Sequence, residues 1–262
     1  MQPYFSIQWH ITDLCDQRCR HCYIFSEGHE HLVSAPFGQL EPTYAQIRTF
    51  CAQLGRTPYI YLTGGDPILH PDFWKLLELF RKDGTRFCVM GNPFHLTDEA
   101  CERMRACECV KYQLSLDGLE RTHDAFRKDG SFRATLAAIP VIRRSGMWCA
   151  VMSTVSKVNM EEIPALIDLV AQLGVDVYAV GRFLPDGDVY ACRRMSSRLG
   201  NVNTDDLYEL WTTKMEAYRA VEKFDKCSRC PLKYICRGCP AVAYGYTHDM
   251  YAADPQCWRE VA

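Results

Sequence analysis

Residues 4–23 read YFSIQWHITDLCDQRCRHCY and join an apolar run to a loop with three cysteines. The run Tyr4–Trp9 has the composition of a β-strand. Cys15, Cys19 and Cys22 follow with the spacing C-x3-C-x2-C, so three thiolates on one tight loop could wrap a single metal cluster. A cubane 4Fe–4S cluster usually takes four cysteines. Three local ligands therefore predict one iron left open for a substrate or cofactor.

A structural zinc site is one alternative for these thiols. Tetrahedral zinc takes four ligands, and His10 or His21 could supply the fourth. Three unrelated buried thiols are the other alternative. The strand, the loop, the spacing and the aromatic residue after Cys22 together favour the iron–sulfur cluster.

The composition of the chain limits the classes of protein to which it could belong. The chain has 262 residues, 48% of them hydrophobic, which is enough for one large α/β domain and a small appendage. Its 30 Lys and Arg and 32 Asp and Glu give a net charge of −2, so we expect no nucleic-acid partner. The sequence shows neither a targeting segment nor an apolar run of ~18 residues, so we expect a cytoplasmic protein without a membrane partner.

The chain has fifteen cysteines, and eight of them lie in two dense groups. Clustered thiols in a reducing compartment indicate a metal rather than disulfides. The two groups are Cys15, Cys19 and Cys22, and Cys227, Cys230, Cys236, Cys239 and Cys257. The other seven lie mostly in apolar or helical surroundings, where cysteine packs as a small hydrophobe: Cys51, Cys88, Cys101, Cys107, Cys109, Cys149 and Cys192.

Short β-rich runs alternate with helical stretches up to about residue 181. After Tyr4–Trp9, the expected strands are Tyr59–Leu62, Arg86–Met90, Lys111–Leu116, Trp148–Thr154 and Asp176–Gly181. The expected helices are Tyr44–Leu54, Pro71–Arg81, Asp98–Arg105, Phe132–Arg144 and Glu161–Leu173. Six such units predict a parallel sheet with right-handed crossovers, either an open doubly wound sheet or a partial barrel. In both folds the site lies at the carboxyl ends of the strands.

The pattern changes in the last third of the chain. Pro185-Asp186-Gly187 is typical of a turn, and Asp205–Val221 has the spacing of one amphipathic helix. A cysteine-rich tail follows, with the spacing C-x2-C-x5-C-x2-C from Cys227 to Cys239 and then Cys257. We therefore expect one domain over residues 1–182 and a metal-binding domain over residues 183–262. A zinc ribbon is the alternative for the tail.

A second motif, Thr63-Gly64-Gly65-Asp66-Pro67, follows the second expected strand. Two glycines let a ligand approach bare backbone, and exposed N–H groups there could hold a charged head group. Together with Cys15, Cys19 and Cys22, this motif resembles the radical S-adenosylmethionine (SAM) enzymes. The resemblance implies a partial (β/α)6 barrel, with Gly64, Gly65, Asp66 and Pro67 at the amino group of SAM. It also implies that the Tyr23 backbone contacts the adenine.

Ser115-Leu116-Asp117-Gly118 resembles a segment of the peptide-modifying branch of that family. The resemblance continues through His123-Asp124, Arg127 and Gly130-Ser131-Phe132. It implies that Ser115 and Arg127 hold the ribose and carboxylate of SAM. It also implies SAM contacts for Ser153 and Thr154, which end the fifth expected strand.

The tail resembles the SPASM/twitch extension of radical SAM maturases, which binds auxiliary 4Fe–4S clusters. This chain lacks part of the full SPASM cysteine pattern, so we expect one auxiliary cluster. Its ligands are expected to be Cys227, Cys230, Cys236 and Cys257, with Cys239 as the rival fourth ligand. A second auxiliary cluster on Cys192 and Cys239 would be short of thiolates.

The resemblance implies two 4Fe–4S clusters and SAM as cofactors, and a 5′-deoxyadenosyl radical that modifies a ribosomally made peptide. Cross-linking, oxidation and epimerisation are the possible outcomes, and Cys192 is the candidate hydrogen donor for epimerisation. The expected partners are that peptide, a flavodoxin or ferredoxin as electron donor, and a separate leader-binding protein. The alternatives are modification of a small molecule such as a tetrapyrrole, and a non-catalytic iron–sulfur or zinc protein.

Overall fold

The computed structural model describes residues 3–20, 22–25, 32–155, 158–180, 188–192, 195, 197–201, 204–231, 233 and 238–257. The chain divides into two compact units, residues 1–181 and residues 182–262, which are considered separately below. The turn expected at Pro185-Asp186-Gly187 lies outside the described residues, as do His21 and Cys236. Among the described residues, no helix is both long enough and apolar enough to span a membrane.

The first unit is built on one parallel sheet of six strands in the order β1-β2-β3-β4-β5-β6. The strands are β1 (Tyr4–Thr12), β2 (Thr57–Gly64), β3 (Phe87–Met90), β4 (Cys109–Ser115), β5 (Trp148–Ser153) and β6 (Val177–Val180). Each crossover moves one strand in the same direction, and within the described chain β1 and β6 are the two edges. A doubly wound sheet would reverse its strand order. The sequential order is that of a partial barrel, as predicted.

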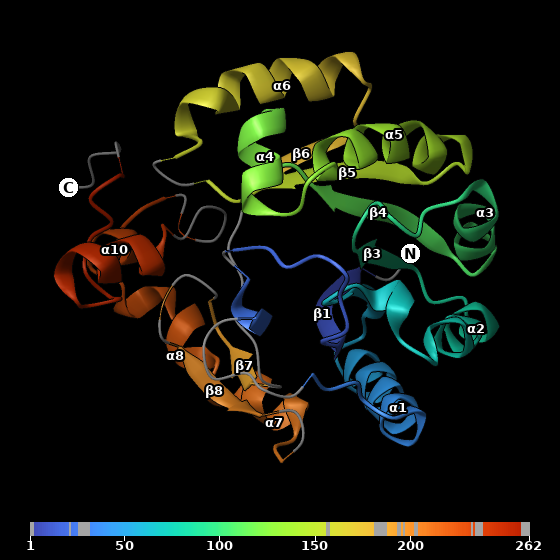
Figure 1. Cartoon of the computed structure of the whole chain (residues 1–262). Coiled ribbons are helices and arrows are strands. Elements are labelled where there is room, and N and C mark those ends of the chain that lie inside the picture. Colours follow the sequence, from blue (N-terminus) through green and yellow to red (C-terminus); the bar gives the residue numbers. More distant parts are fainter. Residues whose placement is uncertain are drawn as a thin grey trace. The chain divides into compact units, whose positions relative to one another are not determined.

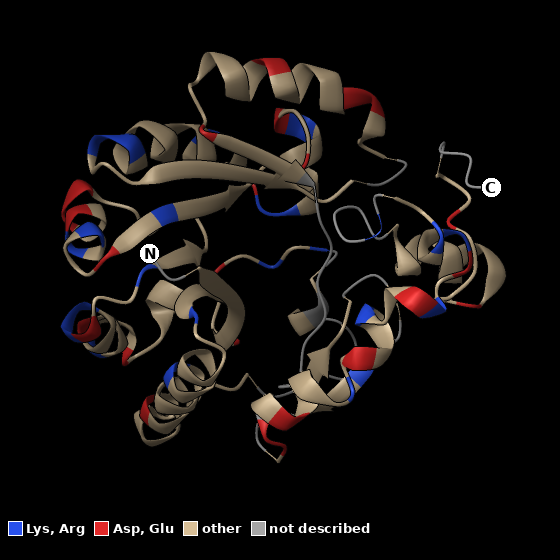
Figure 2. Cartoon of the chain, turned by 180° about the vertical axis from the view of Figure 1, so that it is seen from behind, with Lys and Arg blue, Asp and Glu red and all other residues tan. Residues whose placement is uncertain are grey.

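Helices cover the outer side of this sheet (Figure 1). They are α1 (Phe37–Gln53), α2 (Phe73–Asp83), α3 (Asp98–Ala106), α4 (Glu120–Phe126), α5 (Ser131–Arg144) and α6 (Ile163–Gln172), with 3-10 turns at Tyr23–Phe25, Pro67–Leu69 and Met160–Glu162. Figure 2 shows Lys, Arg, Asp and Glu interspersed on these outer helices, which leaves the sheet and the helix faces against it largely apolar.

The core between sheet and helices is aromatic where β2, β3, α1 and α2 meet. Ile60 and Leu62 of β2 are fully buried, as is Phe87 of β3. The Phe80 ring of α2 lies 5.2 Å from the Phe87 ring and 4.9 Å from the Tyr44 ring, measured between centroids. Burial of such rings supplies much of the stability of a layered α/β unit.

The expected helices occur with shifted ends. Helix α1 begins seven residues before the expected Tyr44 and continues through Pro42, because Leu40 and Tyr44, four positions apart, are both buried. Helix α2 begins at Phe73, so Pro71 lies before the helix rather than in its first turn. Helix α4 was not predicted. Of the seven cysteines outside the two dense groups, six are buried as expected: Cys51, Cys88, Cys101, Cys107, Cys109 and Cys149. The seventh, Cys192, is half-buried.

The second unit contains the antiparallel strands β7 (Asp188–Tyr190) and β8 (Arg198–Asn201) and short helices. The helices are α7 (Leu207–Thr212), α8 (Glu216–Arg219), α9 (Asp225–Ser228) and α10 (Pro240–Thr247), with a 3-10 turn at Val221–Lys223. The single helix expected over Asp205–Val221 is wrong. It breaks after Thr212, where the hydroxyls of Thr212 and Thr213 bond to carbonyls of the preceding turn, the Thr213 Oγ1 at 2.6 Å from the Glu209 oxygen.

The buried ring of Phe80 gives a test of this core. Phe80→Ala should lower the free energy of unfolding by about 3–5 kcal/mol, because it leaves a cavity and removes the ring contacts with Tyr44 and Phe87. Ile167→Ala on α6, where Ile167 is 46% exposed, is the control and should cost about 0.5 kcal/mol or less. Urea unfolding followed by circular dichroism measures both. Equal costs for the two substitutions would contradict the described core.

Candidate functional site

The loop with three cysteines follows β1 at the carboxyl edge of the sheet. Cys15, Cys19 and Cys22 are all half-buried thiols. The Cys22 N–H donates to the Cys19 carbonyl at 3.0 Å, and the Arg20 N–H donates to the Phe126 carbonyl at 2.8 Å. These bonds curl the loop and fasten it to the end of α4.

The glycine motif after β2 packs directly against this loop. The Gly65 N–H donates to the Thr12 carbonyl and the Asp66 N–H to the Leu14 carbonyl, both at 2.7 Å. A Cβ on Gly65 would lie 2.2 Å from the Leu14 oxygen and 2.7 Å from the Asp13 oxygen, so only glycine fits there. The sequence predicted that N–H groups of this motif would be exposed to a ligand. At Gly65 and Asp66 that prediction is wrong, because both groups hold the cysteine loop.

Asp66 is a buried carboxyl group at the meeting point of the two motifs. Within the described chain, neither of its carboxylate oxygens has a hydrogen-bond partner of normal geometry. Burial raises the Asp66 pKa to about 7, although the nearby backbone amides of Asn92 and Ile68 lower it in part. A buried carboxylate without a partner is costly, so this position suits a positively charged ligand group.

Asp16 and His95 lie beside Asp66, and the sequence analysis missed both as site residues. One ligand atom from each of the three residues lies within 4.8 Å of the others, and this is the one such group of His, Cys, Asp or Glu among the described residues. The His95 ring bonds to Asp16 Oδ2 at 3.1 Å. Asn92 donates to Asp16 Oδ1 at 3.0 Å and to the Cys15 sulfur at 3.3 Å. In the sequence, only their position could have indicated these site residues, since Asn92 and His95 follow β3 at the same edge of the sheet.

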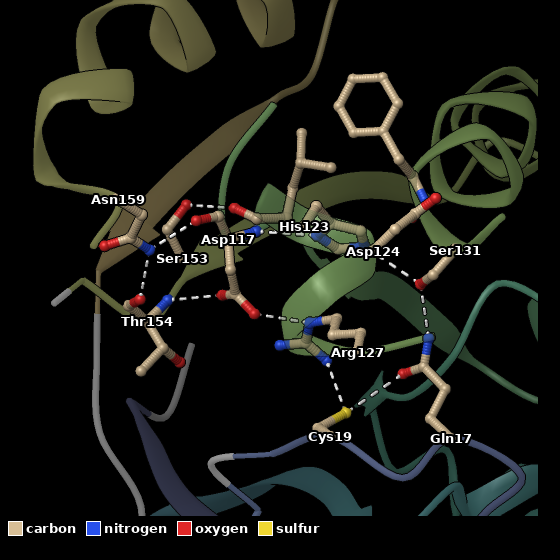
Figure 3. A network of polar contacts seen from close by, with 12 residues as sticks. Gln17, Cys19, Asp117, His123, Asp124, Arg127, Ser131, Ser153, Thr154 and Asn159 are labelled. Atoms are coloured by element: carbon tan, nitrogen blue, oxygen red, sulfur yellow. Dashed lines mark hydrogen bonds and ion pairs between the residues drawn. The ribbon is translucent and has the colours of Figure 1, made fainter. Parts of the chain in front are cut away.

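Arg127 connects the cysteine loop to the end of β4 (Figure 3). Its Nε donates to Asp117 Oδ2 at 2.6 Å, and its Nη1 donates to the Cys19 sulfur at 3.6 Å. The other Asp117 oxygen accepts from the Thr154 N–H at 2.8 Å. Burial lowers the Arg127 pKa, but the charges of Asp117 and Cys19 outweigh it and hold the Arg127 pKa above its ordinary value.

A second chain of contacts fixes Asp117 and the loop from behind (Figure 3). The Asp117 N–H donates to His123 Nδ1 at 3.0 Å, and His123 Nε2 lies 3.0 Å from the Ser131 hydroxyl. The amide of Gln17 donates to the same hydroxyl at 2.7 Å. Asn159 also donates to the Asp117 carbonyl. His123 and Ser131 were noted in the sequence only as part of a resemblance, and Gln17 was missed.

The remaining predicted SAM-binding residues lie along the same edge. Ser115 ends β4 and is half-buried, and Pro67 is buried at the start of a 3-10 turn. The Ser153 hydroxyl donates to the Leu116 carbonyl and lies 2.7 Å from the Tyr178 hydroxyl. The Ser153 hydroxyl is therefore occupied within the fold, and the residue is fully buried. Tyr23 begins a 3-10 turn, and its side chain lies outside the described residues.

Two of the loop thiols, Cys15 and Cys19, lie in surroundings that favour their neutral form. Burial raises the Cys15 pKa to about 11, although the hydrogen bond from Asn92 opposes the shift. Burial also raises the Cys19 pKa, and the Arg127 charge opposes it. A bound metal would supply the positive charge that the thiolate form needs. His10, the alternative zinc ligand, instead bonds to Asp13 Oδ1 at 2.7 Å.

The tail places its described cysteines around two short turns. The Cys230 N–H donates to the Cys227 carbonyl at 3.1 Å. Gly238 has φ +64°, and a Cβ there would lie 2.8 Å from the Cys227 sulfur, so the turn at Gly238 passes beside that sulfur. Asp254 accepts from the Cys239 N–H at 3.1 Å through Oδ2, and its carbonyl accepts from the Cys257 N–H at 3.0 Å. Asp254 thus fixes the backbones of Cys239 and Cys257, the two rival fourth ligands.

Cys192, the candidate hydrogen donor, follows β7 and is half-buried. Its N–H donates to the Ser197 hydroxyl at 2.9 Å, and the same hydroxyl donates to the Cys192 carbonyl at 2.9 Å. These bonds fix the backbone of a turn between β7 and β8.

Two protein families match this chain. Residues 9–170 match the Radical SAM superfamily, and residues 182–240 match SPASM, an iron–sulfur cluster-binding domain. The first match includes the cysteine loop, the glycine motif and Arg127. The second includes Cys192 and four of the five tail cysteines, but not Cys257.

Similar proteins differ in the substrates that their names imply. An AdoMet-dependent heme synthase of Methanosarcina barkeri is 25% identical over 341 residues, covering 96% of this chain and 95% of that protein. The mycofactocin maturase MftC of Mycobacterium tuberculosis is 27% identical over 192 residues, covering 71% of this chain and 47% of that protein. The chain likewise spans about half the length of several other curated relatives.

Solved structures share the fold. The structure of anSMEcpe with bound AdoMet and a Cp18Cys peptide has a TM-score of 0.70 and 14% identity, covering 97% of this chain and 93% of that chain. At this identity the likeness shows the fold alone.

The close approach at Gly65 can be tested by substitution. Gly65→Ala should lower the free energy of unfolding by about 1–3 kcal/mol, because the new Cβ must push the backbone of residues 13 and 14 away. Gly38→Ala is the matched control, since a Cβ there meets nothing within 4 Å, and it should be neutral or stabilise α1 by up to about 1 kcal/mol. Urea unfolding compares them. A Gly65 variant as stable as the Gly38 variant would contradict the described packing.

Proposed function

This chain belongs to the radical SAM superfamily, and from that premise we propose that it binds SAM at a 4Fe–4S cluster and modifies a ribosomally made peptide. Its family and its relatives, which are named as synthases and maturases, make it an enzyme rather than a non-catalytic iron–sulfur carrier. The observation that carries the proposal is the packing of the Gly64-Gly65-Asp66 motif against the cysteine loop.

The residues at the carboxyl edge of the sheet fit the proposed group. Cys15, Cys19 and Cys22 offer three half-buried thiols on one loop, which is the type of ligand that an iron–sulfur cluster takes. Asp66 offers the buried negative charge that an ammonium group of SAM would neutralise. The three loop thiols therefore suit the cluster, and Asp66 suits the ammonium group of SAM.

When bound, the reduced cluster and SAM would supply a 5′-deoxyadenosyl radical, which abstracts a hydrogen atom from an unactivated carbon. Asp66 would accept hydrogen bonds from the SAM ammonium group, and Ser115 and Arg127 would hold its ribose and carboxylate. The Tyr23 backbone would contact the adenine, and Ser153 and Thr154 would complete the SAM contacts. The protein thus positions and shields reactive groups that the cofactor supplies.

The tail would hold one auxiliary 4Fe–4S cluster through Cys227, Cys230, Cys236 and Cys257. Its match to an iron–sulfur cluster-binding domain supports iron rather than zinc. Cys239 stays the rival ligand, because Asp254 holds the backbones of Cys239 and Cys257 alike. An external flavodoxin or ferredoxin would supply the electron, and Cys192 is the proposed hydrogen donor if the product is an epimer.

Two substrate classes are supported by different observations. A peptide is supported by the mycofactocin maturase relative and by the segment from Ser115 to Phe132, which resembles peptide maturases. A tetrapyrrole is the second candidate, because the heme synthase relative matches nearly the whole of both chains. A separate leader-binding protein would accompany the peptide substrate.

Removal of the loop thiols tests the cofactor assignment. The triple variant Cys15→Ala, Cys19→Ala and Cys22→Ala should form no 5′-deoxyadenosine, because no thiolate would hold the cluster to which SAM binds. The wild-type protein, reconstituted without oxygen, should contain about eight irons and the triple variant about four. Chromatography and iron analysis measure the two quantities. Undiminished SAM cleavage by the triple variant would sink the mechanism, and about twelve irons in the wild type would indicate a second auxiliary cluster.

The substrate proposal is tested by product analysis. Incubation with precursor peptides encoded beside the gene should give a mass change of about two hydrogens for a cross-link, or solvent deuterium uptake for an epimer. Cys230→Ala should stop product formation but leave SAM cleavage without substrate intact, since it removes only a tail ligand. Turnover of a tetrapyrrole with every peptide unchanged would overturn the peptide assignment and leave the cofactor assignment standing.

A further inference from the structure

We propose that Arg127 raises the reduction potential of the cluster bound by the cysteine loop, acting as a charged hydrogen-bond donor to the Cys19 sulfur. This inference rests on the proposed function, because it assumes that Cys19 is a cluster ligand. It assigns Arg127 a positioning and electrostatic role that does not depend on SAM.

The geometry aims the guanidinium group at the sulfur. Arg127 Nη1 lies 3.6 Å from the Cys19 sulfur, while Nε donates to Asp117 Oδ2 at 2.6 Å. Only 11% of the Arg127 side chain and 1% of the Asp117 side chain are exposed. A buried arginine held by two partners at once has little freedom to turn elsewhere.

Asp117 is itself fixed on three sides, so it can serve as a rigid support for Arg127. Its Oδ1 accepts from the Thr154 N–H at 2.8 Å, and its own N–H donates to His123 at 3.0 Å. Its carbonyl accepts from Asn159. An ion pair between Arg127 and Asp117 would not by itself require Asp117 to be held on three sides. A guanidinium group that must point at one sulfur does require such a rigid support.

Reduction adds one electron to the cluster, and that electron comes from a low-potential one-electron donor such as a flavodoxin or dithionite. No bond to Arg127 forms or breaks, and Arg127 keeps its proton. The cluster and its three thiolates become one unit more negative on reduction. A fixed positive charge in contact with a ligand sulfur therefore stabilises the reduced form more than the oxidised form.

The Asp117 carboxylate opposes this effect only in part. The guanidinium lies between the carboxylate and the sulfur (Figure 3). Arg127 Nη1 contacts the Cys19 sulfur directly at 3.6 Å, whereas the Asp117 carboxylate bonds to Nε on the other side of the guanidinium. The nearer charge is the positive one, so the pair as a whole favours extra negative charge on the sulfur.

The test is a redox titration of the full-length, reconstituted protein without SAM, followed by electron paramagnetic resonance. The signal of the loop cluster is identified as the one absent from the triple cysteine variant. Arg127→Met should lower its midpoint potential by at least 59 mV, which is a tenfold fall in the ratio of reduced to oxidised cluster for one electron. Arg127→Lys keeps the charge and should lie closer to the wild type.

Arg133→Met is the matched control, because it removes the same charge from an exposed pair with Glu120 in the same unit. Its midpoint potential should equal that of the wild type. A wild-type potential in Arg127→Met overturns the proposal. If that variant does not retain the cluster, the neutral Arg127→Gln decides by the same criterion. A wild-type protein without any signal that depends on the three loop cysteines would instead overturn the proposed function.

Discussion

The backbone of Gly65 lies against the carbonyls of Asp13 and Leu14, and this contact joins the ends of β1 and β2. The N–H groups of Gly65 and Asp66 are used to hold the cysteine loop, at 2.7 Å each. The same turn buries the Asp66 carboxyl group next to that loop. The three loop thiols and a buried carboxyl group thus come together through main-chain hydrogen bonds, which need one residue without a side chain at their centre.

The sequence predicted most of the fold because its signals are local. Each of the six strands is a short β-rich run, and each begins and ends within about two residues of its expected bounds, except that β1 ends three residues later, at Thr12. The prediction of one helix over Asp205–Val221 was wrong, and the apolar periodicity of that segment could not have revealed why. Apolar spacing continues through Thr212 and Thr213, but their hydroxyls compete for the carbonyls of the last turn.

The site was predicted at the level of motifs and missed at the level of contacts. The cysteine and glycine motifs are each contiguous, so spacing reveals them. The links between motifs join distant residues, as in the bonds from Gln17 to Ser131 and from Arg127 to Cys19, which span 114 and 108 positions. No local pattern marks such pairs. The single hint was topological, because Asn92, Asp117 and Thr154 all follow strands whose carboxyl ends share one edge.

That shared edge is consistent with relatives as different in name as a heme synthase and a mycofactocin maturase. The residues proposed to hold the cluster and SAM come from the ends of β1, β2, β4 and β5 and from the turn after α4. Cys19, Arg127 and Thr154 are linked by hydrogen bonds through Asp117, so this part of the support is held together without a substrate. Substrate choice must then come from side chains outside this support. Such a division lets a fold keep one radical-generating edge while its substrate changes.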